Sequence, residues 1–135
     1  MFSQFSPAAR AVVTLAEQES RNASHYYLGT EHLLLAMVIA PSGDVAQHLE
    51  WLGLEPWQVK RALRDATGGT FEHSWEGIIV TERVKRIFRL ATARAQGAKR
   101  VEPMDLLHAI IADGRGLAAR VLAGLGGPMA AAGKN

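Results

Sequence analysis

The chain has 135 residues, of which 48% are hydrophobic and 21% charged, and this length and composition are typical of one globular domain. Its formal net charge is only +2, which gives weak support for a polyanion-binding protein. It has no cysteine, which excludes disulfides and thiol chemistry and fits a reducing compartment. No signal-peptide pattern opens the chain, and the longest apolar run, residues 33–41, is too short to span a membrane, so we expect a cytoplasmic protein without a membrane partner.

The first half of the chain predicts four helices. Ser6 suits an N-cap and Pro7 the first helical position, and apolar residues then recur at helical spacing. The predicted helices cover residues 6–22, 30–40, 44–52 and 56–66.

The stretch from residue 28 to residue 35 is a tight turn that leads into a helix expected to be buried on most sides. Gly29 fits a position that a Cβ would crowd, and Thr30 is predicted to be the N-cap. Glu31 then lies in the first turn, where the helix dipole favours an acid. From the local pattern alone, Glu31 has both a structural interpretation, as a helix-start acid, and a functional one.

The second half repeats the pattern of the first. Helices are predicted over residues 81–96, 103–113 and 116–124, and the apolar positions of the first of them follow those of residues 6–22 at an offset of 75. The later helices follow at an offset of 73. We therefore predict an all-α fold of two pseudo-symmetric repeats of about four helices each, in one domain over residues 1–126. The expected limits are 5–66 for repeat one, 67–79 for a linker and 80–126 for repeat two.

The second copy departs from the first in two places. Residues 127–135 are rich in glycine and alanine and are predicted to be a flexible tail, so repeat two lacks a clear last helix. Met104 stands where repeat one has Glu31, so the second copy has no acid at that position.

These residues resemble the Clp N-terminal repeat, which occurs twice in the N-terminal domains of the Clp/Hsp100 AAA+ unfoldases. The resemblance covers residues 2–126, and Met1, Phe2 and Phe5 are most similar to the ClpC type. The matching residues of the first copy are 5–10, 15–16, 27–35 (YLGTEHLLL), 45–46 and 52–53. Those of the second copy are Thr81, Arg83, Lys85, Arg86, Leu90, Ala91, Leu106, Leu107, Val121 and Leu122.

The resemblance implies a non-catalytic interaction module that docks adaptor and substrate proteins for an ATPase ring. The chain would be either an excised domain or a stand-alone relative that competes for adaptors or sequesters peptide-like ligands. In ClpC-type relatives the acids of this turn help to recognise phosphorylated arginine, because a carboxylate pairs with a guanidinium and helix-start amides hold a phosphate. Glu31 and Thr30 match that pattern, whereas Met104 weakens the case for a second such site.

The search for catalytic and metal-binding patterns finds none. The only near-miss to a phosphate-binding loop is Gly133-Lys134, which lacks the earlier glycine and the following serine or threonine. The five histidines are His25, His32, His48, His73 and His108, and their spacing does not fit a zinc site. We therefore expect no enzyme activity, no metal and no cofactor. An unrecognised small-molecule enzyme is the least favoured of the three functional interpretations.

Two further surfaces carry functional hypotheses. Phe2, Arg10 and Lys85 are predicted to border a groove for a peptide-like ligand at the seam of the repeats, since Arg10 and Lys85 are equivalent at the 75-residue offset. Simple packing of Phe2 against the first helix is the alternative. The basic stretch from Arg83 to Arg100 gives the second hypothesis, a nucleic-acid-binding helical protein, although aromatic residues are not interleaved there.

Overall fold

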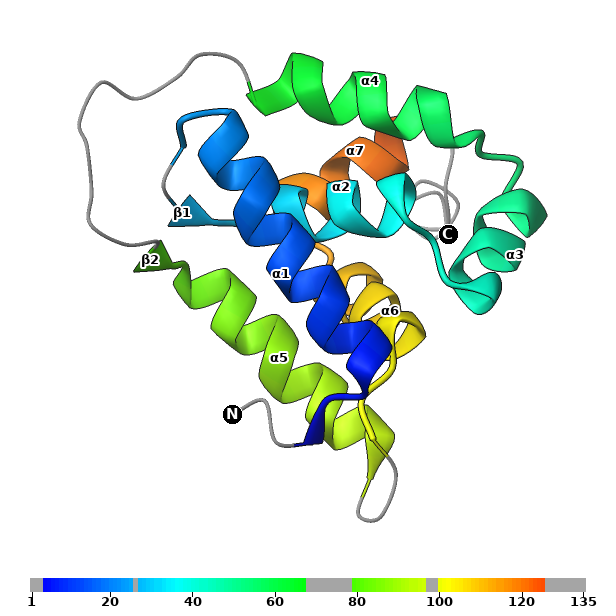
Figure 1. The fold of residues 1–135 in the computed structure, drawn as a ribbon. Coiled ribbons are helices and arrows are strands. Elements are labelled where there is room, and N and C mark those ends of the chain that lie inside the picture. The colour runs from blue at the N-terminus through cyan, green and yellow to red at the C-terminus, as the bar shows by residue number, and fades with distance from the viewer. Residues whose placement is uncertain (1–3, 26, 68–78, 97–99, 126–135) are drawn as a thin grey trace.

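A computed structural model describes residues 4–25, 27–67, 79–96 and 100–125 of the chain. Within these ranges the chain forms seven α-helices and two very short strands (Figure 1). The elements are α1 (Pro7–Asn22), β1 (Tyr27–Leu28), α2 (Thr30–Ile39), α3 (Gly43–Trp51), α4 (Pro56–Thr67), β2 (Ile79–Val80), α5 (Glu82–Ala95), α6 (Pro103–Asp113) and α7 (Leu117–Gly124). The prediction of an all-α fold with two related halves is confirmed, and no helix end differs from the predicted one by more than one residue.

Equivalent caps begin the first helix of each half. The Ser6 hydroxyl accepts from the amide of Ala9 at 3.1 Å, and the Thr81 hydroxyl accepts from the amide of Val84 at 3.2 Å. Both caps stand at the same place in the repeat, 75 residues apart. A side-chain oxygen at the N-cap satisfies one of the free amides of the first turn, and this is why both helices begin where the sequence pattern placed them.

Each half contributes a short extended segment that pairs with the other half, which the sequence pattern did not predict. β1 pairs in parallel with β2, so that Leu28 lies opposite Val80, and the Thr81 amide donates to the Leu28 carbonyl at 3.1 Å. The equivalent pair at the other side is Phe5 with Val101. There the Ser6 amide donates to the Val101 carbonyl at 2.9 Å. The segment before each first helix therefore pairs with the other half, and the two halves are intertwined.

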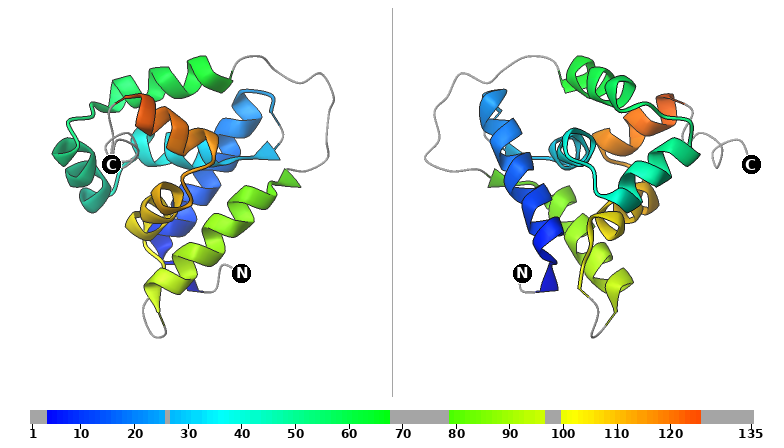
Figure 2. Two further views of the ribbon diagram at one scale, coloured as in Figure 1. Left: turned by 180° about the vertical axis from the view of Figure 1, so that it is seen from behind. Right: turned by 45° about the vertical axis from the view of Figure 1, so that its right-hand side comes forward.

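The core lies around α2, which has other helices packed around it (Figures 1 and 2). Every residue from position 30 to position 38 is buried, and α2 contacts α1, α4, α6 and α7. The buried positions of α1 recur on α5 at the 75-residue offset. They are Ala9, Val12, Val13, Ala16 and Ser20 on α1, and Val84, Ile87, Phe88, Ala91 and Ala95 on α5.

Several boundary predictions fall on residues that the structure does not describe. Most of the predicted linker over residues 67–79 lies outside the described residues, and so does the predicted tail over residues 127–135, where a last helix of repeat two would belong. The division into repeats at residues 66 and 80 therefore stays a prediction. Among the described helices, none is both long enough and apolar enough to cross a bilayer.

Candidate functional site

The first turn of α2 brings a carboxylate into the interior. Gly29 is the N-cap and Thr30 is the first helical residue, so the prediction that Thr30 caps this helix is wrong. Glu31 follows and is only 7% exposed. A Cβ on Gly29 would clash with Oε1 of Glu31 and lie 2.8 Å from its Cδ, because the carboxylate folds back over the turn. Space, and not backbone conformation, therefore favours glycine at position 29, since its backbone φ of −107° is open to any residue.

A buried pair of histidines, His25 and His32, contacts this turn through hydrogen bonds. The Gly29 amide donates to Nδ1 of His32 at 3.0 Å, so that nitrogen carries no proton. The neutral ring keeps its proton on Nε2, which lies 2.8 Å from Nδ1 of His25 and donates to it. Burial, partly opposed by the charge of Glu31, lowers the pKa of His32 to about 4. His32 is therefore neutral at physiological pH and holds the Gly29 amide in place.

Tyr27 orients the Glu31 carboxylate. The tyrosine hydroxyl donates to Oε2 of Glu31 at 2.7 Å, and the tyrosine ring contacts the rings of His25 and His32. Partial burial and the hydrogen bond to Glu31 both raise the pKa of the Tyr27 phenol. The phenol therefore stays protonated and continues to donate, which leaves Oε1 as the atom of Glu31 with lone pairs for another cation.

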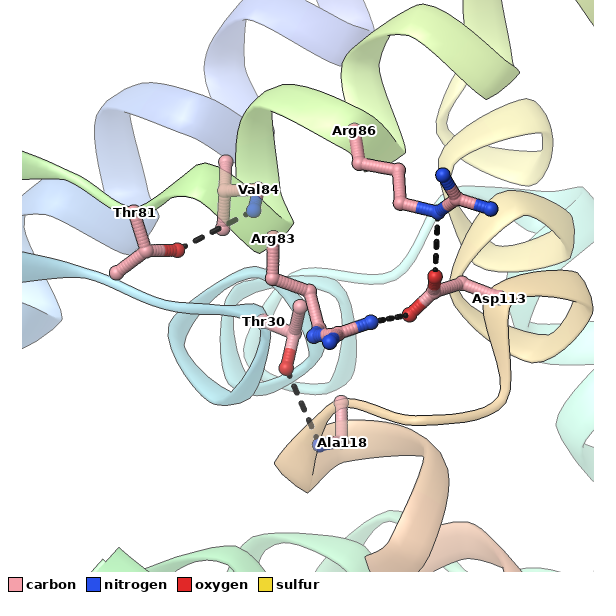
Figure 3. A network of polar contacts seen from close by, with 7 residues as sticks. All are labelled: Thr30, Thr81, Arg83, Val84, Arg86, Asp113 and Ala118. Carbon is pink, nitrogen blue, oxygen red and sulfur yellow. Dashed lines mark hydrogen bonds and ion pairs between the residues drawn. The ribbon is translucent and has the colours of Figure 1, made fainter.

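Repeat two faces this turn with an ion-pair network (Figure 3). The Asp113 carboxylate accepts from Nη1 of Arg83 at 2.8 Å and from Nε of Arg86 at 2.9 Å. Burial by itself would raise the pKa of Asp113. The hydrogen bonds from Arg83 and Arg86, the charge of Arg83 and a backbone hydrogen bond from Arg115 outweigh it and hold that pKa below its ordinary value. The network holds the aliphatic stem of Arg83 beside Thr30 (Figure 3).

Thr30 joins the two halves instead of capping its own helix. Its hydroxyl accepts from the amide of Ala118 at 3.3 Å, which caps the first turn of α7 (Figure 3). The N-cap of α7 is Gly116, which has no side chain to do so. A Cβ on Gly116 would lie 2.7 Å from the Thr30 hydroxyl and 3.0 Å from Cδ of Arg83. The glycine therefore permits α2, α5 and α7 to approach one another closely.

These elements line an open cavity of about 370 Å³, which we call the Glu31 pocket. The starts of three helices, α2, α5 and α7, contribute to its wall. Its charged and phenolic lining residues are Tyr27, Glu31, Arg83, Arg115 and Arg120. One acidic residue thus lines the pocket together with three arginines, of which Arg83 is paired with Asp113, and helix N-termini add partial positive charge. The arrangement can hold a cationic group at Glu31 and an anionic group beside the arginines.

The structure separates the residues that the sequence grouped as site candidates. Glu31 and Thr30 lie together in the Glu31 pocket. Arg10 is exposed on α1, and Lys85 is half-exposed on α5, where its Nζ lies 3.2 Å from Oε1 of Glu82. Lys85 lines a shallow cavity of about 460 Å³ whose described lining residues all come from α5. Phe2 lies outside the described residues.

Sequence reasoning missed the part of the pocket that comes from repeat two. Thr81 was noted as a match to the repeat and as a helix start, and Arg83 as a match to the repeat and as the start of the basic stretch. Arg115 and Arg120 were not selected at all. A usable signal for Thr81 and Arg83 was present, because the short extended segments before the helices repeat at the same offsets. Nothing in the local pattern around Arg115 or Arg120 marked them, since their role depends on the packing of α7 against α2.

The basic stretch from residue 83 to residue 100 is largely paired with acids. Arg83 and Arg86 bind Asp113, Lys85 binds Glu82, and Nε of Arg94 lies 3.2 Å from Oδ1 of Asp105. Four basic side chains of this stretch therefore form ion pairs, which does not favour the nucleic-acid hypothesis. Among the described residues, no group of three or more histidine, aspartate or glutamate side chains could hold a metal ion.

Comparison with known proteins gives consistent results. Residues 4–125 match the family described as Clp repeat (R) N-terminal domain. The chain is 35% identical to the Bacillus subtilis protein named negative regulator of genetic competence ClpC/MecB, over 93% of this chain and 16% of that protein. The chain thus spans about one sixth of the length of the curated relatives that it first matches.

Solved structures share the fold at low sequence identity. The N-terminal domain of the chaperone ClpD from Arabidopsis thaliana aligns with a TM-score of 0.73 at 22% identity, over 97% of this chain and 93% of that one. The N-domain of ClpV in complex with a VipB peptide aligns with a TM-score of 0.68 at 18% identity, over 90% of this chain and 76% of that one.

Proposed function

The chain belongs to the Clp N-terminal domain family, and from that premise we propose that it is a non-catalytic module that docks adaptor or substrate proteins of a Clp unfoldase. The N-domain of a relative, ClpV, is known in complex with a peptide, which supports a peptide-binding role for this fold. The cytoplasmic location stays a prediction.

We further propose that the Glu31 pocket is the docking site and that its ligand is a phosphoarginine side chain. The observation that carries this proposal is the lining of the pocket, in which Glu31 is the single acid beside Arg83, Arg115 and Arg120. A phosphorylated guanidinium presents a cation-like N–H edge and a phosphoryl group on one side chain. Glu31 would accept from the N–H edge, while the arginines and the helix starts would hold the phosphoryl oxygens.

The geometry also argues for selectivity. An unmodified arginine would gain Glu31 but would place a full positive charge among three others. A phosphoserine would gain the arginines but would leave the buried Glu31 carboxylate beside a second anion. Only a ligand with both groups satisfies the two sides of the pocket.

Fluorescence anisotropy with three labelled peptides of one sequence tests this proposal. The peptides carry phosphoarginine, arginine or phosphoserine at the same position. We expect the phosphoarginine peptide to bind most tightly, and we expect Glu31→Gln and Arg120→Gln each to weaken it about tenfold, because each removes a charge-assisted contact.

Arg21→Gln is the matched control, since Arg21 is exposed at the end of α1 and does not line the pocket. Equal binding of all three peptides, or full binding by Glu31→Gln, would refute the phosphoarginine assignment.

The seam groove predicted from Phe2, Arg10 and Lys85 remains a second candidate, supported at Lys85 by the cavity that it lines with Phe88 and Thr92 on α5, whose described lining does not include Arg10. It would bind peptide-like ligands through the lysine charge and the apolar side chains. Lys85→Ala and Glu31→Gln separate the two sites in one titration with an adaptor protein of a Clp unfoldase. Loss of binding in Lys85→Ala alone would assign the adaptor to the seam groove.

A further inference from the structure

A further cavity lies in repeat two, between the end of α5 and the start of α6. It has a volume of about 620 Å³, within the range of small-ligand pockets, about 300–1,000 Å³. Its described lining residues are Arg94, Ala95, Gln96, Arg100, Glu102 and Asp105. None of these residues lines the Glu31 pocket, and all except Ala95 carry a charge or an amide. We call this cavity the Arg100 cavity.

The internal repeat explains why the Arg100 cavity is open. At the offset of 73, Arg100 corresponds to Tyr27 and Asp105 to His32. At the corresponding place in repeat one, the rings of Tyr27, His32 and His25 pack against one another with centroids 5.0–5.4 Å apart. In repeat two, a guanidinium and a carboxylate replace two of those three rings. The shared frame therefore leaves a concave space here, which ring side chains fill in repeat one only.

Two segments contribute the polar groups of the cavity. The end of α5 supplies Arg94 and Gln96, and the extended segment before α6 supplies Arg100 and Glu102. Val101 is fully buried, and side chains alternate along an extended backbone, so the exposed Arg100 and Glu102 both point away from the core. Gln96 has a φ of 49°, and positive φ values at residues other than glycine are concentrated at functional sites. Each segment thus supplies one guanidinium and one side-chain oxygen acceptor.

Asp105 is already engaged within the protein. Its Oδ2 accepts from the Glu102 amide at 2.9 Å, and its Oδ1 lies 3.2 Å from Nε of Arg94. This ion pair uses only the Nε side of Arg94, whose side chain is 51% exposed, so both Nη groups can donate into the cavity. Among the described residues, no acid forms an ion pair with Arg100. The cavity therefore offers a ligand two guanidinium donors and the exposed carboxylate of Glu102.

These charges select a ligand that carries both signs. Asp105 balances Arg94, and Arg100 and Glu102 then add one charge of each sign. A simple anion would bind the arginines but would stand beside the Glu102 carboxylate, and a simple cation would meet the reverse conflict. A ligand with a carboxylate and an ammonium group forms charge-assisted hydrogen bonds with both kinds of side chain.

We propose that the Arg100 cavity binds a small zwitterion, namely an α-amino acid with an uncharged polar side chain or a short peptide of such residues. The ligand carboxylate accepts from Arg94 and Arg100, and its ammonium group donates to Glu102 and to the amide oxygen of Gln96. Ala95 is the one apolar residue of the described lining, so a hydrophobic ligand side chain would gain little from burial. This inference goes beyond the proposed function, because it concerns another surface and a ligand without a phosphoryl group.

The test compares three related probes by NMR titration of the labelled protein. L-Glutamine carries both charges, glutaminamide lacks the carboxylate, and N-acetylglutamine lacks the ammonium group. We expect glutamine to shift the amide signals of Gln96, Glu102 and Asp105. We expect it to bind at least about tenfold more tightly than either analogue, since each analogue loses a charge-assisted contact. The dipeptide of two glutamines distinguishes the two sources, because tighter binding than glutamine assigns the cavity to peptides and weaker binding assigns it to free amino acids.

Arg100→Gln and Glu102→Gln test the two charges separately. We expect each to weaken glutamine binding by about tenfold. Glu102→Gln should bind N-acetylglutamine at least as tightly as wild type does, because that probe has no ammonium group and the change removes a repulsive charge. Arg89→Gln is the matched control, an exposed arginine of α5 outside the described lining, and Glu31→Gln tests the other pocket. We expect both to bind glutamine as wild type does.

Three results would overturn the proposal. The first is equal binding of glutamine and N-acetylglutamine, because the cavity would then bind anions alone. The second is unchanged glutamine binding by Arg100→Gln, with circular dichroism as the check that the variant keeps its helices. The third is a glutamine titration, carried to the solubility limit, that shifts none of the amide signals at the cavity.

Discussion

The two halves of this molecule share a backbone frame and differ at the surface that the frame presents. In repeat two, Arg83, Arg86 and Asp113 form ion pairs across the outer surface between α5 and the end of α6. At the equivalent positions repeat one has Ala8, Ala11 and Ala40, which line an open apolar groove. The core does not differ in this way, because buried positions of α1 and α5 correspond one to one.

This contrast shows which positions the fold constrains. The buried positions of the two helices are apolar in both halves except for Ser20, whose hydroxyl donates to the Tyr27 carbonyl, since a close-packed interior disfavours polar groups without a partner. An exposed position on the same helix has no such requirement, and the two copies carry opposite chemistry there. Duplication therefore supplies two equivalent places, and side-chain differences at a few positions give them different surface chemistry.

Equivalent core substitutions give the largest expected effect and test the symmetry directly. Leu33 on α2 and Leu106 on α6 are both fully buried and stand 73 residues apart. We expect Leu33→Ala and Leu106→Ala each to lower the free energy of unfolding by about 3 kcal/mol, from lost burial and the cavity left behind. Urea denaturation measures both. If one loss is much smaller than the other, the core is less symmetric than the buried positions indicate.

The pH dependence of stability should distinguish the two helix starts, because His32 in repeat one corresponds to Asp105 in repeat two. The Asp105 carboxylate accepts from the Glu102 amide at 2.9 Å, as His32 accepts from Gly29. The pKa of His32 is about 4 in the folded chain, against about 6.5 in an unfolded one, so the unfolded state binds the extra proton. The stabilisation is complete above pH 6.5 and is lost as the pH falls toward 4.

We expect this loss to reach about 2–3 kcal/mol between pH 7 and pH 4. Denaturation in urea across that range measures it. His32→Asn is the control, because an amide oxygen can accept from Gly29 without titrating. An identical pH profile in wild type and His32→Asn would contradict the role given to the histidine.

The ion-pair network gives a smaller effect and tests the difference between the two surfaces. Asp113→Ala removes a carboxylate whose side chain is 3% exposed and leaves Arg83 and Arg86 without their partner. We expect a loss of about 1–2 kcal/mol in the free energy of unfolding. Ala40→Asp, the reciprocal change in repeat one, should alter stability by less than about 0.5 kcal/mol, since Ala40 is exposed. Thermal denaturation compares the two, and equal losses would argue against the network.

The smallest expected effect concerns two equivalent helix caps. The Val45 amide of α3 is capped by the nearby Ser42, whereas the matching Ala118 amide of α7 is capped by Thr30 from another helix. We expect Ser42→Ala and Thr30→Val each to cost about 1 kcal/mol. Hydrogen exchange should separate them: Thr30→Val should raise exchange in α7 and in the first turn of α2 together, and Ser42→Ala in α3 alone. Faster exchange confined to α2 would contradict the cross-cap.

The sequence alone determined the helices and their repetition. The periodic apolar positions, together with caps such as Ser6 and Thr81, are local signals. Local signals can be recognised in the sequence without knowledge of the fold. The crowded turn at Gly29 was also predicted correctly, because only a glycine there suits an acid that folds back two residues later.

Only the tertiary structure decided how the halves meet and what lies between them. The Thr30 hydroxyl bonds to an amide 88 residues away, and a residue that would ordinarily cap its own helix thereby caps another. The pairing of β1 with β2 brings Thr81 and Arg83 to Glu31, and the packing of α7 brings Arg115 and Arg120. No periodicity encodes such contacts, because each depends on the relative placement of elements distant in the chain, which the combined packing of the core sets.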